Sequence, residues 1–145
     1  MAFRFSLDTV LRYRENIETR EEAALQNILQ QIATVAATID QLSAQIATGN
    51  RTRSELPGRP VNALYLQAML NEITAAGKRR TELLNTLASL EGKRDEQLKI
   101  YQTAHRNRQM LSNMLDDQQE SWEQERTRSE QKILDDLFAA RTQRA

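Results

Sequence analysis

Few side chains in this sequence have the types and spacing that chemistry requires. His105 is the only histidine, and the chain contains no cysteine. Asp116–Asp117 and Asp135–Asp136 are adjacent carboxylates, and neighbours on a helix point about 100° apart, so neither pair converges on a metal ion. No Gly-x-x-x-x-Gly-Lys loop is present to hold nucleotide phosphates. We therefore expect no catalytic residue, no metal site and no cofactor, and we interpret His105 as a solvated or flanking residue.

The charge balance limits the kinds of partner. Twenty acidic and twenty basic residues cancel, so no general attraction to nucleic acid or anionic lipid is expected. The basic run Lys78–Arg80 is spread around a helix and is interpreted as ordinary surface. No apolar run approaches the roughly 18 residues of a membrane span, and Met1–Phe5 lacks the apolar part of a signal peptide. We expect a soluble, intracellular chain that binds no nucleic acid and does not insert into a membrane.

The composition predicts an all-α protein made of very long helices. Aromatic residues are 5% of the chain, and Pro57 and Pro60 are its only prolines. Both prolines lie in the turn-forming segment 49–60, and helical patterns flank this segment on both sides. We predict one coiled-coil domain over 1–145, a hairpin of two long antiparallel helices. Its first helix spans about 6–55 with Ser6 as N-cap, the turn about 56–60, and the second helix about 61–140.

Both predicted helices carry a seam of residues spaced alternately three and four apart, which is typical of a coiled coil. The first seam is Leu7, Leu11, Arg14, Glu18, Glu21, Leu25, Ile28, Ile32, Val35, Ile39, Leu42 and Ile46. The second is Leu66, Met69, Ile73, Ala76, Arg80, Leu83, Leu87, Leu90, Arg94, Gln97, Tyr101, Ala104, Arg108, Leu111, Leu115, Gln118 and Trp122. Gly77 and Gly92 lie inside the second helix, where each costs about 1 kcal/mol relative to alanine.

The charged seam positions distinguish between two registers of the hairpin. One register pairs Ile46 with Asn62 and sets Arg14 against Arg94, which places like charges together. The next pairs Ile46 with Met69 and sets Glu21 against Arg94, with Glu18 beside Gln97. Because opposite charges in a seam are favoured over like charges, we predict the second register, with Glu21 and Arg94 as the register pair and a tight turn.

The second helix is predicted to outreach the first, which runs out opposite about 101–108. Thirty or more residues would then have no partner within the chain. Trp122 on this overhang is interpreted as an interface anchor, with self-association or local packing as the alternative. Arg80, Arg94 and Arg108 recur every fourteen residues along the seam. They either control the register or offer a row of positive charge to a partner.

Both ends of the chain resemble one family. The opening, Phe3–Glu15, resembles the start of the FliJ family, the coiled-coil stalk proteins of the bacterial flagellar type III export ATPase. The closing stretch, Glu130–Leu137, resembles that family's C-terminal segment, with Asp136 where the family more often has glutamate. Leu64–Leu70, after the turn, is also similar. The resemblance covers essentially the whole chain, and the two ends make it specific.

The resemblance implies a non-enzymatic central stalk. Such a stalk promotes assembly of the hexameric ring of the export ATPase FliI and links this ring to the export gate protein FlhA. It also implies an escort role for substrate chaperones, and a cytoplasmic location at the inner face of the cell membrane. The residues that would contact the ring are Phe3, Phe5, Leu7, Leu11, Arg14, Leu111, Leu115, Trp122, Lys132, Leu134 and Leu137. Those that would contact the gate are Tyr65, Leu66 and Met69. The alternatives are an injectisome stalk or a generic self-associating coiled-coil scaffold.

Overall fold

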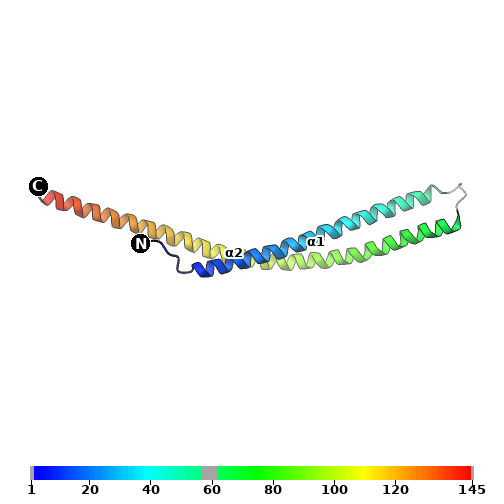
Figure 1. Cartoon of the computed structure of the whole chain (residues 1–145), viewed down its shortest axis with the longest axis horizontal. Helices are drawn as coiled ribbons and strands as arrows, with labels where there is room; N and C mark the ends of the chain where they lie inside the picture. The colour runs from blue at the N-terminus through cyan, green and yellow to red at the C-terminus, as the bar shows by residue number, and fades with distance from the viewer. Residues whose placement is uncertain (1, 57–61, 145) are drawn as a thin grey trace. The chain divides into compact units, whose positions relative to one another are not determined.

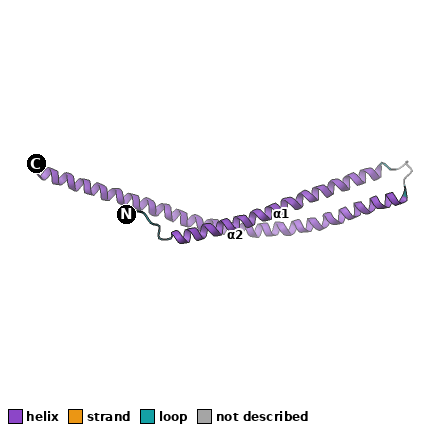
Figure 2. Cartoon of the chain, viewed as in Figure 1, coloured by secondary structure: helices purple, strands orange, loops and turns teal. Residues whose placement is uncertain are grey.

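The computed structural model describes residues 2–56 and 62–144. These residues form two helices, α1 (Asp8–Ser54) and α2 (Ala63–Arg144), and no strand occurs among them (Figures 1 and 2). The predicted fold class, an all-α hairpin of two long helices, is confirmed. Of the predicted turn 56–60, only Leu56 is described, and the rest lies outside the described residues. Within the part of the chain described, no helix is long and apolar enough to cross a lipid bilayer.

The starts of the two helices differ in how they are capped. The Leu7 carbonyl accepts the first α-helical hydrogen bond, from the Leu11 N–H at 2.8 Å, so Leu7 occupies the N-cap position predicted for Ser6. A turn closed by a hydrogen bond from the Asp8 N–H to the Phe5 carbonyl precedes α1, which begins at Asp8. For α2, the Asn62 side chain accepts a hydrogen bond from the Leu64 N–H at 3.0 Å and is a true polar cap.

The chain divides into two compact units, each containing parts of both helices. The terminal unit comprises Met1–Glu21 and Tyr101–Ala145, and the central unit comprises Glu22–Ile100. Within the central unit the two helical segments lie side by side (Figure 1). Its most buried residues, Leu25, Ala76 and Leu90, all belong to the predicted seams.

The predicted seams are correct at the level of single residues. Every seam residue of α1 from Leu11 to Ile46 is buried or half-buried, and so is every seam residue of α2 except the exposed Gln118. The charged positions Glu18 and Arg108 therefore lie in the seam together with the aliphatic ones. The alternating three-and-four spacing was thus sufficient to place each face of each helix.

The predicted register is wrong by one heptad in the central unit. The predicted pairing places Gly49 opposite Leu66, but Gly49 faces Ile73, whose Cγ1 would lie 2.8 Å from a Cβ at position 49. Likewise, the Arg80 guanidinium donates a hydrogen bond to the Ser43 hydroxyl at 3.5 Å. The prediction assumed a tight turn, whereas α1 ends at Ser54 and α2 begins at Ala63, which allows a longer connection.

In the terminal unit, Glu18 contacts Arg108 and His105, where the prediction placed it beside Gln97. The pair Glu21–Arg94 joins residues of different units and stays a prediction, although the register on which it was based is wrong. Among the described contacts, Arg94 forms an ion pair with its neighbour Asp95 at 3.2 Å, and Glu21 with Arg20 at 3.5 Å.

Three helical glycines give a test of this register. Gly49→Ala would gain about 1 kcal/mol of helix propensity but would press on the stiff, branched Ile73, which costs about 1–3 kcal/mol. Gly77→Ala and Gly92→Ala meet nothing within 4 Å and serve as matched controls. Thermal unfolding should show both controls more stable than the parent chain by roughly 0.5–1 kcal/mol and Gly49→Ala less stable than either. Equal gains at all three positions would contradict the close approach at Gly49.

Candidate interaction surfaces

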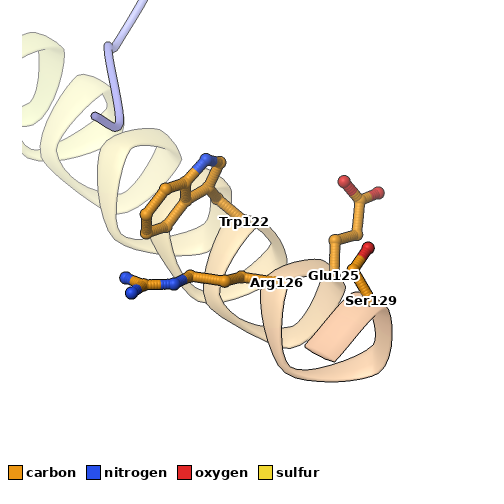
Figure 3. Close-up of a pocket in the computed structure, with 4 residues that line it drawn as sticks. All are labelled: Trp122, Glu125, Arg126 and Ser129. Atoms are coloured by element: carbon orange, nitrogen blue, oxygen red, sulfur yellow. The ribbon is translucent and has the colours of Figure 1, made fainter. Parts of the chain in front are cut away.

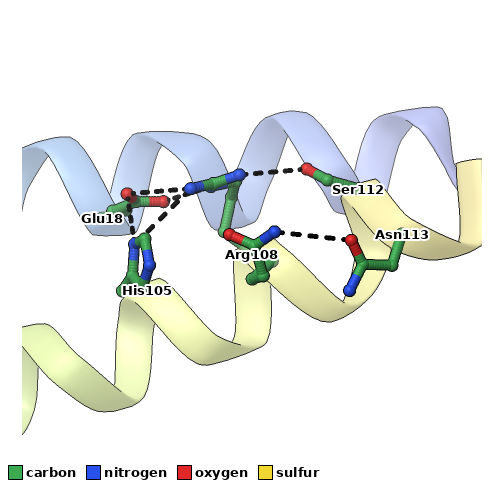
Figure 4. Close-up of polar contacts among 6 residues, drawn as sticks. Glu18, His105, Arg108, Ser112 and Asn113 are labelled. Atoms are coloured by element: carbon green, nitrogen blue, oxygen red, sulfur yellow. Dashed lines mark hydrogen bonds and ion pairs between the residues drawn. The ribbon is translucent and has the colours of Figure 1, made fainter. Parts of the chain in front are cut away.

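A polar cluster joins α1 to α2 within the terminal unit. Glu18 of α1 faces His105 and Arg108 of α2 (Figure 4). Its carboxylate accepts hydrogen bonds from Nε and Nη2 of Arg108, and Glu18 Oε1 lies 3.1 Å from His105 Nδ1. Arg108 also donates to the Ser112 hydroxyl at 3.2 Å. The Glu18 and Arg108 side chains are 16% and 23% exposed, so the pair is largely withdrawn from water.

The electrostatics of this cluster favour the charged forms of both partners. The hydrogen bonds from Arg108 lower the pKa of Glu18, burial opposes that shift, and the hydrogen bond with His105 adds to it. The hydrogen bonds to Glu18 raise the pKa of Arg108 for the same reason. A two-pronged contact between opposite charges is directional, so the cluster fixes the register of this unit.

Replacing Glu18 should destabilise the protein in a pH-dependent way. Glu18→Gln leaves the half-buried Arg108 without its anion, and we expect a loss of about 1–3 kcal/mol at neutral pH. Because the folded pKa of Glu18 is lowered, the stabilisation is complete above the unfolded pKa of about 4.3 and is lost as pH falls through the folded pKa. Denaturant unfolding from pH 7 to pH 3 should show the difference shrinking.

The control for this measurement is Glu22→Gln, which changes an exposed glutamate of the same helix and should alter stability little at any pH. A constant difference between Glu18→Gln and the parent chain across the pH range would contradict the assigned role.

The segment before α1 packs against α2 in the terminal unit. Phe5 is 8% exposed, and Leu11 of α1 and Ala104 of α2 are each 6% exposed. The Phe3 ring lies 5.9 Å from that of Trp122, centroid to centroid, at an interplanar angle of 53°. A surface groove of about 440 Å³ is lined by Phe3, Arg4, Phe5, Asp8 and Leu115. This segment therefore covers part of the α2 seam that the sequence led us to expect bare.

Trp122 has neighbours on its own helix as well. The Arg126 guanidinium lies 5.5 Å from the centre of the indole ring, a cation–π contact. A second groove, lined by Trp122, Glu125, Arg126 and Ser129, opens beside it (Figure 3). The indole is half-buried by this local packing, and the interpretation of Trp122 as an interface anchor stays a prediction.

The unpartnered part of α2 is correspondingly shorter than predicted. Leu111 and Leu115, predicted to lie beyond the reach of α1, are half-buried in the terminal unit. Every described side chain from Glu123 to Arg144 is exposed, and we call this segment the tail. Its largest apolar side chains are 59–73% exposed: Ile133, Leu134, Leu137 and Phe138.

The packing of Phe3 on Trp122 can be read by fluorescence, because Trp122 is the only tryptophan. Phe3→Ala removes the ring that covers the indole, so the emission should move to longer wavelength as water reaches it. Phe138→Ala removes an exposed aromatic ring of the tail and should leave the spectrum unchanged. Identical spectra for Phe3→Ala and the parent chain would show that Phe3 does not cover Trp122.

The predicted ring-contact residues separate into two groups. Those that pack within the terminal unit are Phe3, Phe5, Leu7, Leu11, Arg14, Leu111, Leu115 and Trp122, all buried or half-buried. Lys132, Leu134 and Leu137 lie on the exposed tail. Of the predicted gate-contact residues, Tyr65 is exposed and Leu66 and Met69 are half-buried in the seam.

Sequence reasoning missed the cluster around Glu18. His105, interpreted as solvated or flanking, is half-buried against Glu18. The available signal was the opposite charge of two seam residues, Glu18 and Arg108, which meet in neither of the two registers predicted from the seam charges. Arg80 and Arg108 both bond to α1, which supports register control over a row of free charge.

Within the described residues, no group of three or more histidine or acidic side chains is placed to hold a metal ion. Comparison of the chain with protein-family models, with curated proteins and with solved structures finds no match.

Proposed function

We propose that this chain is the non-enzymatic stalk of a bacterial flagellar type III export apparatus. In this role it promotes assembly of the ring of the export ATPase FliI, links the ring to the export gate protein FlhA and escorts substrate chaperones. Such a protein works at the cytoplasmic face of the cell membrane without entering it. The sequence resemblance at both ends of the chain, Phe3–Glu15 and Glu130–Leu137, motivates the proposal.

The observation that carries the proposal is the exposure of Leu134 and Leu137 on the tail. Fully burying one such side chain is worth about 1.5–3 kcal/mol, so a helix that displays both has much to gain from a partner. They lie within the closing stretch that resembles the family's C-terminal segment. A single extended helix also suits insertion into the central opening of a ring.

We assign different roles to the residues in different parts of the chain. Phe3, Phe5 and Leu11 are used in packing the terminal unit, so their proposed contribution to the ring contact is to present the tail. At the opposite end of α2, Leu64 and Tyr65 are 78% and 56% exposed, which supports a gate contact there through Tyr65.

ATP hydrolysis by the cognate FliI, measured with increasing amounts of this chain, tests the proposal. The parent chain should stimulate hydrolysis. Leu134→Ser with Leu137→Ser should raise the concentration for half-maximal stimulation by about tenfold or more, because two apolar contacts are lost. Trp122 and Leu115 are poor choices for this test, because changing them also disturbs packing within the terminal unit.

The matched control is Leu84→Ser with Leu98→Ser, which changes two exposed leucines of α2 in the central unit. It should stimulate as the parent chain does. The proposal fails if the parent chain does not stimulate the ATPase, or if the tail variant and the control behave alike.

A further inference from the structure

We propose that the tail also pairs, in antiparallel orientation, with the tail of a second copy of this chain. The pairing goes beyond the proposed function and does not depend on it. It rests on two properties of the tail, an exposed apolar face and charges at the two ends of that face that complement each other in only one orientation.

The apolar face is compact and lies on one side of the helix. Leu134 and Leu137 are three positions apart and share a face, while Ile133 and Phe138 flank them. Leu134, Leu137, Phe138 and Arg141 line a surface groove. A lone helix gains most of its stability from what covers its apolar face, and all four apolar side chains are well exposed.

Opposite charges bracket this face at equal distances. Glu130 lies four residues before Leu134 and Arg141 lies four residues after Leu137, so both continue the same seam. In antiparallel pairing, a two-fold axis lies midway between Leu134 and Leu137. It places Leu134 opposite Leu137 of the second copy, and Leu137 opposite Leu134 of the second copy. The same axis places Glu130 opposite Arg141 of the second copy, so that two such ion pairs form, and it places Ile133 opposite Phe138.

Parallel pairing has the opposite electrostatic outcome. It would set Glu130 against Glu130 and Arg141 against Arg141, and like charges across a helical seam are unfavourable. Within one copy, Glu130 Oε1 accepts a bond from Arg126 at 3.2 Å, in an exposed pair of the kind that contributes little. A carboxylate has room for further donors, so this contact does not prevent a bond from Arg141 of the second copy.

The interface is small, with four apolar side chains from each copy, and we expect a weak dimer with a dissociation constant of roughly 1–100 µM. The same face cannot pair with a second copy and contact another protein at once. Self-pairing would therefore compete with any partner that binds Leu134 and Leu137.

Sedimentation equilibrium of the full chain, in the absence of other proteins, tests the pairing. The parent chain should show a concentration-dependent dimer. Arg141→Glu alone and Glu130→Arg alone should each weaken it by about tenfold or more, because each change creates two like-charge contacts. The double variant, Glu130→Arg with Arg141→Glu, should restore it, because the opposite charges face each other again.

Arg128→Glu is the control, since Arg128 lies on the side of the tail away from Leu137 and is exposed. It should dimerise as the parent chain does. Circular dichroism of each variant checks that the helices are retained, which separates a lost contact from a lost helix.

A parent chain that stays monomeric at about 200 µM overturns the proposal. So do single variants that dimerise like the parent chain, which is the result expected of parallel pairing, and so does a double variant that stays weak. None of these results involves the export ATPase. A monomeric chain that still stimulates FliI would refute the pairing and leave the proposed function intact.

Discussion

Neither long helix of this chain can cover its own apolar seam, and the rest of the structure follows from that constraint. In the central unit, α1 and α2 bury the seam against each other, and Gly49 allows a close approach to Ile73. In the terminal unit, the α2 seam is covered first by α1 and then by Phe5 and Phe3. Where this cover ends, after Trp122, apolar side chains remain in water.

The fold class and the buried face of each helix could be predicted from the sequence, because a three-and-four repeat is a property of one helix alone. The register could not, because it depends on the connection between the helices and on which pairs meet. The predicted register, the second of two alternatives, relied on a tight turn. The structure uses a longer connection, and in its terminal unit the opposite charges of Glu18 and Arg108 meet. A residue such as Gly49 has no evident role until its neighbour on the other helix is known.

The candidate site was predictable in part, for the same reason. Leu134 and Leu137 were named as contact residues through the resemblance of the closing stretch, and the structure leaves both exposed. The packing of Phe3 on Trp122 could not be predicted, because Phe3 precedes the first helix and follows no helical repeat. Periodicity describes regular elements and says nothing about where an irregular segment folds back.

The cover over Trp122 has a consequence for dynamics. Phe3 and Phe5, which supply this cover, belong to the short non-helical segment that precedes Asp8. The turn of this segment is closed by one backbone hydrogen bond, from the Asp8 N–H to the Phe5 carbonyl. Regions held by so few bonds open at a small fraction of the free energy of global unfolding. Amide protons at the beginning of the chain would then exchange quickly while those of α1 and of the packed part of α2 stay protected. Each such opening would expose Leu115 and Trp122 further without unwinding a single turn of α2.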